Sequence, residues 1–231
     1  MKNIRIEGVG EVELKKSARA KRLILKINQS GKPIVTIPDY VPYIVAEKFA
    51  YQHIDWFKQH ISTKTELIIH EGKRIGKIHT VHYQAKNVAK PTSRISSDSI
   101  TISYPQEVNV AEYAVQIEAN KASVRALRRQ AERYLPPMLY NLASKYGYEY
   151  REVRIKAVQT RWGSCSSNRI INLSIWLMQL PHELTEYVLC HELTHLSNMN
   201  HSPEFWAELS KMIPDYKLKK LKLKKFSPKL M

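Results

Sequence analysis

Residues 181–196 read PHELTEYVLCHELTHL, and the rest of the chain is best understood from this stretch outward. Pro181 suits the first position of a helix, and the acidic residues Glu183 and Glu186 favour the positive end of a helix dipole. The stretch therefore predicts a helix of about fifteen residues, ending near Asn198.

Two histidines, His191 and His195, lie four residues apart on this predicted helix, and Glu192 follows the first of them. Residues four apart lie roughly 40° apart around a helix axis and one turn along it, so both imidazoles can reach one metal ion. Glu192 then points to the neighbouring side of the helix. This H-E-x-x-H pattern is typical of zinc hydrolases, in which the glutamate acts as general base toward a metal-bound water.

A third histidine, His201, follows six residues after His195. The helix must stop sharply for His201 to return to the same ion, and such a stop usually needs a residue in the left-handed region. Asn198 tolerates that conformation, so we expect it to make the turn. Residues 202–204, Ser-Pro-Glu, combine an N-cap, a first-turn proline and an acidic residue, and they predict a new helix just after His201. Three nitrogen ligands and one open position suit a single Zn²⁺ ion.

The remainder of the chain changes character near residue 111. Short apolar stretches between turn residues predict seven strands before that point: 2–6, 12–15, 23–28, 34–37, 66–69, 78–85 and 99–104. Helical spacing predicts one helix over 43–60, and the stretch 90–99 is expected to be a loop. The sequence thus predicts an α+β protein with a β-rich N-terminal lobe over residues 1–110, followed by a metal-binding catalytic domain over 111–231.

Within that second domain, residues 111–135 have helical spacing, and Pro136-Pro137 is expected to end or kink the helix. Residues 151–158 and 168–176 read as strands on either side of the loop Trp-Gly-Ser-Cys-Ser-Ser. The expected outcome is a helix, a small sheet and then the histidine-bearing segment.

Composition narrows the possible partners. The 231 residues include 37 Lys and Arg against 21 Asp and Glu, a net charge of +16 and a pI near 9.7. A nucleic acid, a nucleotide or another polyanion is one interpretation, and a solubilising basic surface is the other. The tail over 217–225, with six lysines, allows the same two interpretations.

The location of the protein is predicted from the absence of sequence features that are typical of membrane proteins and secreted proteins. The longest apolar runs fall far short of the ~20 residues that cross a bilayer, so no membrane association is expected. No secretory signal pattern precedes the first strand. The two cysteines, Cys165 and Cys190, are expected to be free thiols in a reducing cytoplasm.

Several short motifs together resemble a known family. These are TRWGSCS at 160–166, INL at 171–173, HELTHL at 191–196 and NHS at 200–202 with Phe205-Trp206. They are similar to the YgjP-like metallopeptidase family, related to the SprT-like and WLM metalloproteases, over roughly residues 153–214. The resemblance implies a compact zincin-like domain with a small antiparallel sheet and an active-site helix. It also implies that His191, His195 and His201 bind the metal and that Glu192 is the base.

Two further residues are candidates for binding substrate. Arg161 could bind a carboxylate or phosphate, or stabilise an oxyanion, because a guanidinium offers a fixed fork of donors. It could equally pin its loop onto the sheet. Asn172, on the following strand, is expected to line the cleft.

The sequence favours a cytoplasmic zinc metallopeptidase that acts on peptides or proteins. This hypothesis predicts a free strand edge beside the motif helix, contributed by residues 168–176, that holds an extended peptide. One alternative is a metal-dependent phosphohydrolase acting on nucleotides, with Arg161 near the metal. The other is a nucleic-acid-associated protein with a vestigial metal site.

Overall fold

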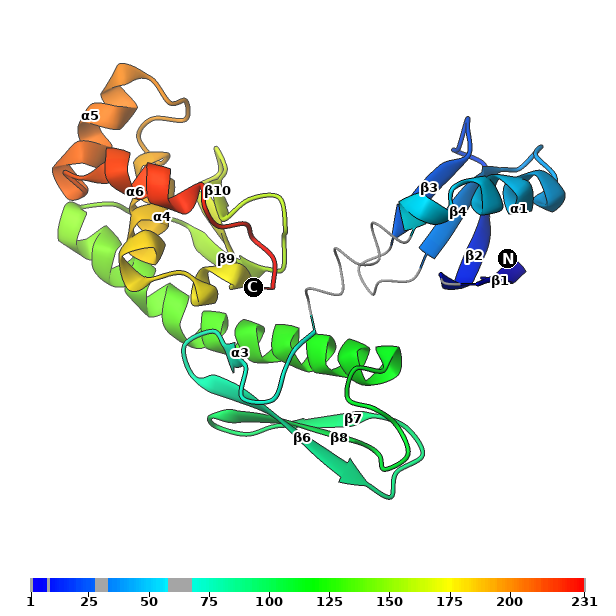
Figure 1. The fold of residues 1–231 in the computed structure, drawn as a ribbon. Helices are drawn as coiled ribbons and strands as arrows, with labels where there is room; N and C mark the ends of the chain where they lie inside the picture. The colour runs from blue at the N-terminus through cyan, green and yellow to red at the C-terminus, as the bar shows by residue number, and fades with distance from the viewer. Residues whose placement is uncertain (1, 8, 28–32, 58–67, 231) are drawn as a thin grey trace. The chain divides into compact units, whose positions relative to one another are not determined.

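The computed structural model describes residues 2–7, 9–27, 33–57 and 68–230. Strands and helices follow one another in separate runs along these residues, which confirms the α+β fold class (Figure 1). The chain forms two compact units, residues 1–68 and 69–231. Among the described residues, no helix is both long enough and apolar enough to cross a membrane.

The first unit is a four-stranded sheet with one helix, α1 (Tyr43–Gln52). The strands are β1 (Lys2–Ile6), β2 (Gly10–Ser17), β3 (Ile24–Ile27) and β4 (Pro33–Pro38), in the order β1-β2-β4-β3. Alternate residues of β2 and β4, such as Leu14 and Val35, are fully buried beside Ala46 and Ala50 of α1. β3 and β4 overlap the strands predicted over 23–28 and 34–37 and pair with each other antiparallel, and residues 28–32 between them lie outside the described residues. Residues 54–57 are also helical, and the predicted helix end at His60 lies outside the described residues as well.

The second unit begins with another four-stranded sheet, which packs against the long helix α3 (Tyr113–Tyr146). Its strands are β5 (Arg74–Ile75), β6 (His79–Lys86), β7 (Thr92–Ile95) and β8 (Ser99–Pro105), in the order β5-β6-β8-β7. β7 falls in the stretch 90–99 that was predicted to be a loop. Residues 68 and 69 are not in a strand, although a strand was predicted over 66–69, of which 66 and 67 lie outside the described residues.

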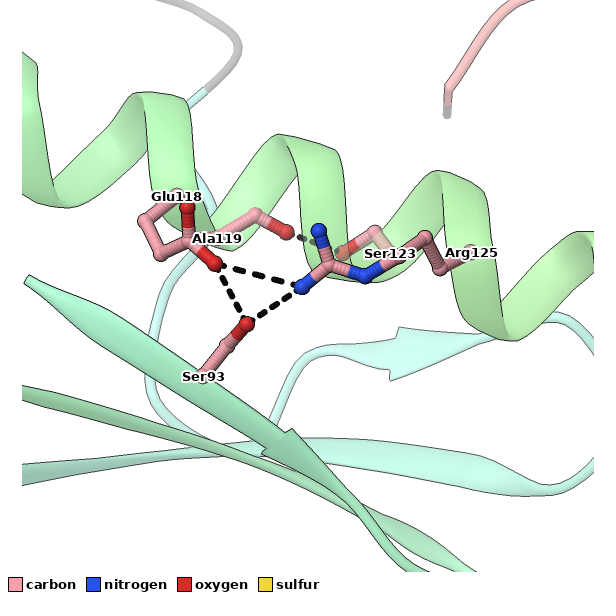
Figure 2. A network of polar contacts seen from close by, with 5 residues as sticks. All are labelled: Ser93, Glu118, Ala119, Ser123 and Arg125. Atoms are coloured by element: carbon pink, nitrogen blue, oxygen red, sulfur yellow. Dashed lines mark hydrogen bonds and ion pairs between the residues drawn. The ribbon is translucent and has the colours of Figure 1, made fainter.

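Hydrogen bonds connect α3 to both edges of this sheet, at β5 on one side and at β7 on the other. At the β5 edge the buried Gln130 accepts a hydrogen bond from the Lys77 amide at 2.7 Å and donates to the Ile75 carbonyl at 3.0 Å. At the β7 edge, Figure 2 shows Arg125 and Glu118 of α3 holding the hydroxyl of Ser93 on β7, at 2.5 Å each. Because β5–β8 are bound to α3 in this way, the division between units lies at 68/69, whereas the sequence predicted a lobe boundary at 110.

Helix α3 is a single element of 34 residues, and Pro136 and Pro137 lie inside it. Of the two predicted outcomes, an end or a kink, the helix does not end at this pair but continues to Tyr146. The two prolines leave the carbonyls four residues earlier without their usual intrahelical donors. Leu135 and Leu139, on either side of the pair, are fully buried in the core, and this packing maintains the helix across the break.

A three-stranded sheet and three helices complete the unit at the C-terminal end of α3 (Figure 1). The strands are β9 (Glu152–Lys156), β10 (Gly163–Cys165) and β11 (Ile170–Ser174), followed by a 3₁₀ turn at Ile175–Gln179. The helices are α4 (His182–Thr194), α5 (Pro203–Met212) and α6 (Tyr216–Leu223).

The sheet of this region is mixed, not antiparallel as the resemblance implied. Its order is β10-β11-β9, with β10 antiparallel to β11 and β11 parallel to β9. The chain leaves β9, runs back along β10 and reverses at a turn where Arg169 has a positive φ of 58°. β11 therefore runs in the direction of β9 and lies between the other two strands.

Candidate metal centre

Helix α4 and the start of α5 bring three histidines together. The candidate ligand atoms of His191, His195 and His201 all lie within 4.8 Å of one another. The Nε2 atoms of His191 and His201 are 3.0 Å apart. Nitrogens bound to one tetrahedral zinc ion at ~2.0–2.1 Å lie roughly 3.3 Å from each other, so this spacing fits a shared ion.

The turn that returns His201 to the other histidines differs from the predicted one. Helix α4 ends at Thr194, and His195 caps it in the right-handed region. Arg169 is the sole non-glycine residue with a positive φ in the described part of the chain, so Asn198 is not left-handed. Hydrogen bonds fix the turn instead: the Asn198 amide donates to the Thr194 carbonyl, and the Asn198 carbonyl accepts from Nδ1 of His195, each at 3.0 Å.

The predicted start of the next helix is confirmed. Ser202 is the N-cap of α5, Pro203 occupies its first turn, and Glu204 is the acidic residue of that turn. Phe205 follows and is fully buried beneath the histidines, with its ring centroid 4.7–4.9 Å from all three imidazoles. Trp206 stacks on His201 at 5.5 Å and donates its Nε1–H to the His201 carbonyl at 3.1 Å. The two aromatic side chains therefore pack against the histidines, Phe205 against all three rings and Trp206 against His201.

The electrostatic environment favours the neutral form of His191 and His201. Burial, with the neighbouring imidazoles and Lys220, lowers the pKa of His191 to about 3. The pKa of His201 is also lowered, first by burial and then by His195 and Lys220. A metal needs the unprotonated imidazole, and protons therefore compete little for these nitrogens near neutral pH. Three imidazole nitrogens form a donor set that suits zinc, so the residues present fit the ion that the motif implies.

Glu192 lies beside the histidines and is almost completely buried, with 5% of its surface exposed. Its Oε2 atom is buried and has no hydrogen-bond partner among the described residues. Burial raises the pKa of Glu192 to about 8, and the charge of Arg161 opposes that rise. An unpartnered carboxylate oxygen in a buried position carries a large energetic cost, which is typical of a group kept for a functional partner.

Gly163 on β10 makes room for Glu192. A Cβ at this position would lie 2.7 Å from Oε1 of Glu192 and 2.8 Å from both Cδ and Cγ. The absence of a side chain, and not backbone freedom, is therefore what this position requires. Sequence reasoning gave Gly163 no role, although it was part of the quoted motif, because the proximity of β10 to α4 is a tertiary property.

Changing Gly163 to Ala is expected to displace Glu192 and to destabilise the protein by about 1–3 kcal/mol, the usual cost of overpacking. A shift of the carboxylate by about 1 Å is expected to lower kcat roughly 10²-fold for a reaction that uses Glu192 as its base. Thermal unfolding and steady-state kinetics measure the two effects. Ser164→Ala is the matched control, because the neighbouring strand residue points to the other face of the sheet. Full activity of Gly163→Ala would show that the Glu192 side chain can adopt another position without loss of function.

The two predicted substrate-binding residues occupy different positions. Arg161 is exposed just before β10, close enough for its charge to lower the pKa of Glu192. Asn172 pairs with Ser164 across β10 and β11, and its Nδ2 donates to the Ser164 hydroxyl at 3.3 Å. Because side chains alternate along a strand, both lie on the face opposite Gly163 and Glu192. The structure therefore brings Arg161 toward the site and does not bring Asn172 among the histidines.

Both cysteines are free, as expected. Burial and then the charge of Glu192 raise the pKa of the Cys165 thiol to about 11, while Arg169 opposes the rise. The thiol is therefore protonated near neutral pH and is a poor nucleophile or ligand. Cys190 is fully buried within α4, where it is a packing residue.

The solved structures that are similar to part of the chain include two crystal structures of metallopeptidase zymogens. Abylysin of Pyrococcus abyssi is 28% identical, with a TM-score of 0.36 over 39% of this chain and 93% of that one. Jannalysin of Methanocaldococcus jannaschii is 21% identical, with a TM-score of 0.33 over 38% of this chain and 93% of that one. No curated protein matches the sequence. The sequence pattern of the YgjP-like metallopeptidase domain matches residues 21–226, most of the chain, and the protein therefore belongs to the YgjP-like metallopeptidase family.

Proposed function

We propose that this metallopeptidase is zinc-dependent, with His191, His195 and His201 holding one Zn²⁺ ion and Glu192 acting as general base. One observation carries the proposal: three histidine ligand atoms lie within 4.8 Å of one another, and Glu192, the residue after His191, has a buried carboxyl oxygen with no partner among the described residues. The free thiols Cys165 and Cys190 support a reducing compartment such as the cytoplasm as the place of action.

The chemistry divides between the ion and the chain. When bound, the ion supplies a Lewis acid that polarises the scissile carbonyl and makes a water molecule in the site more acidic. Glu192 accepts the proton of the attacking water at its unpartnered Oε2 and later gives it to the leaving amine nitrogen. Its burial tunes it for this exchange, because a base is most efficient when its pKa lies near the working pH. Gly163 has no side chain and therefore leaves the space that the Glu192 carboxyl group occupies.

A peptide substrate is proposed to add as a strand beside β10. The predicted edge over residues 168–176 is wrong, because β11 is the central strand and is paired on both sides. β10 is an edge strand and packs against α4, which carries Glu192. No strand within the described residues pairs with its outer side.

The register identifies the backbone groups that this edge offers. The amide of Ser174 donates to the carbonyl of Trp162, and the amide of Ser166 donates to the carbonyl of Ile170. Residues 162, 164 and 166 therefore point their backbone groups toward β11, because antiparallel pairing alternates between bonded and unbonded residues. Gly163 and Cys165 point theirs outward, where an extended peptide would pair with them and pass Glu192.

Arg161, two residues before Gly163, is proposed to contact the substrate at the entrance to this edge. It is exposed, and its charge reaches Glu192. A guanidinium in this position would bind a substrate carbonyl or carboxylate. The role of Asn172 stays a prediction, limited to substrate side chains that lie on the far face of the sheet.

The experiment that tests the proposal is a cleavage screen of the zinc-loaded protein against a mixed peptide library, with products identified by mass spectrometry. We expect the zinc-loaded protein to cleave peptides. A chelator that removes the zinc should abolish the cleavage, and added zinc should restore it. Nucleoside triphosphates belong in a parallel assay. Zinc-dependent phosphate release without any peptide cleavage would replace the peptidase with a phosphohydrolase, whereas no turnover on either set would favour a vestigial site.

A further inference from the structure

One carboxylate outside the histidine cluster joins three elements around it. Glu208 lies half-buried on α5, about one and a half turns after the start of that helix. Its Oε1 accepts a hydrogen bond from the Tyr148 hydroxyl at 2.6 Å, and its Oε2 accepts one from Nδ2 of Asn198 at 2.5 Å. Tyr148 follows the C-cap of α3, and Asn198 lies in the turn between α4 and α5. Glu208 therefore ties the end of α3 and the turn to α5.

The anchor of Tyr148 is itself rigid. Gly147 ends α3 in the left-handed region with φ 73°, and the Tyr148 amide donates back to the Ala143 carbonyl at 2.9 Å. Burial and the hydrogen bond to Glu208 raise the pKa of the Tyr148 hydroxyl. The hydroxyl thus remains protonated and donates, so Glu208 accepts from two fixed donors.

Asn198 connects this carboxylate to the metal centre. Its side chain donates to Glu208, while its backbone carbonyl accepts a hydrogen bond from Nδ1 of His195 at 3.0 Å. A carbonyl can only accept, so Nδ1 must carry the proton of the neutral ring. The lone pair of His195 is then on Nε2. In metal sites such outer contacts fix the tautomer and ring orientation of a histidine ligand.

We propose that Glu208 is a positioning residue of the metal centre, which acts through Asn198 to hold His195 with its Nε2 lone pair turned toward the ion. The inference rests on the proposed zinc site. Glu208 touches no histidine of the cluster in any described contact, so its effect must pass through the turn. The same contact fixes α5 against the turn, and thereby the place of His201, which precedes α5.

The test is the zinc affinity of variants, measured by competition with a chromophoric chelator. Glu208→Ala is expected to bind zinc roughly 10–100-fold more weakly, the usual effect of removing an outer-shell partner. Glu208→Gln is expected to keep most of the affinity, because its amide oxygen accepts from Asn198 and its amide nitrogen donates to the Tyr148 hydroxyl. Glu204→Ala is the matched control, since it removes the same charge from the exposed first turn of α5. An equal loss in Glu204→Ala would make the effect electrostatic and overturn the proposal.

A double-mutant cycle with Asn198→Ala tests the route. If Glu208 acts through Asn198, the double variant binds zinc as the weaker single variant does, because both changes remove one interaction. Additive losses would overturn this route. Nitrogen NMR of the metal-free protein gives a second readout: Nδ1–H of His195 should dominate in the wild type and mix with Nε2–H in Glu208→Ala. If Glu208→Ala does not fold, Asn198→Ala carries the test, because it removes the other partner of the same hydrogen bond and is expected to weaken zinc binding by the same factor.

Failure of this inference differs from failure of the zinc site itself. If the wild type binds no zinc tightly, the proposed metal centre is absent. If the wild type binds one ion and Glu208→Ala binds it equally well with an unchanged His195 tautomer, the positioning role alone is overturned.

Discussion

Replacing Glu192 with Gln is expected to lower kcat for peptide cleavage roughly 10²–10⁴-fold while leaving zinc affinity nearly unchanged. The amide has the shape of the carboxylate and fits beside Gly163, where no larger group does. It cannot accept the proton of the attacking water. Because the three histidines supply the proposed ligands and Glu192 supplies none, binding of the ion should survive the change.

The measurement is steady-state cleavage of a peptide found in the library screen, beside chelator competition for zinc. Glu183→Gln is the matched control, because Glu183 lies in the exposed first turn of the same helix and bonds Lys222 at 3.0 Å. Its activity should equal that of the wild type. A Glu192→Gln protein that keeps full activity would remove Glu192 from the mechanism and leave the observed cleavage to another base.

The same variant has a pH-dependent effect on stability in the metal-free protein. The pKa of Glu192 is about 8 in the folded state, above the usual value of 4.5, so the folded state holds the proton more tightly. Stability from this group is therefore present below about pH 4.5 and is lost as pH rises through about 8. Glu192→Gln removes this loss, so its melting temperature should exceed that of the wild type more at pH 9 than at pH 5. An equal difference at both pH values would mean that the carboxyl is ionised without cost.

The clustering of the three histidines could be predicted because it depends on local geometry. The four-residue spacing of His191 and His195 fixes two imidazoles on one face of any helix, whatever surrounds it. The Ser-Pro-Glu run after His201 set the start of α5 for equally local reasons. Even so, α4 ends at Thr194, four residues earlier than predicted. The turn that follows is closed by the hydrogen bond from Asn198 to Glu208, which lies ten residues further along the chain.

The parts that sequence did not reveal depend on tertiary packing. β7 has little apolar alternation, and it is a strand because it pairs with β8 and is bonded to α3 through Ser93. The position of β11 between two partners follows from where β10 folds back, which no property of its own residues encodes. Pro136 and Pro137 are tolerated inside α3 because the flanking leucines are buried in the core. In each case a long-range contact overrides a local preference.

Replacing His191 with Ala is expected to abolish binding of a tight zinc equivalent. The three rings are mutually close: His191 lies 4.9 Å from both His195 and His201, which are 4.8 Å from each other, and Nε2 of His191 is 3.0 Å from that of His201. The two histidines that remain supply one protein ligand fewer than a catalytic zinc site uses. The other two rings rest on Phe205 and should not move to fill the space.

The fold should survive the loss of His191, which makes the result interpretable. Removing the imidazole leaves a cavity, but it also removes a buried Nδ1 atom that has no hydrogen-bond partner among the described residues. These effects oppose each other, so the metal-free variant should melt within a few degrees of the wild type, roughly 2–4 °C for each kcal/mol that remains. His182→Ala is the control: it removes an exposed histidine from the first turn of the same helix and should bind one ion as the wild type does. A folded His191→Ala protein that still binds one zinc ion tightly would place the metal elsewhere, and the role of Glu192 would then have to be sought again from that second site.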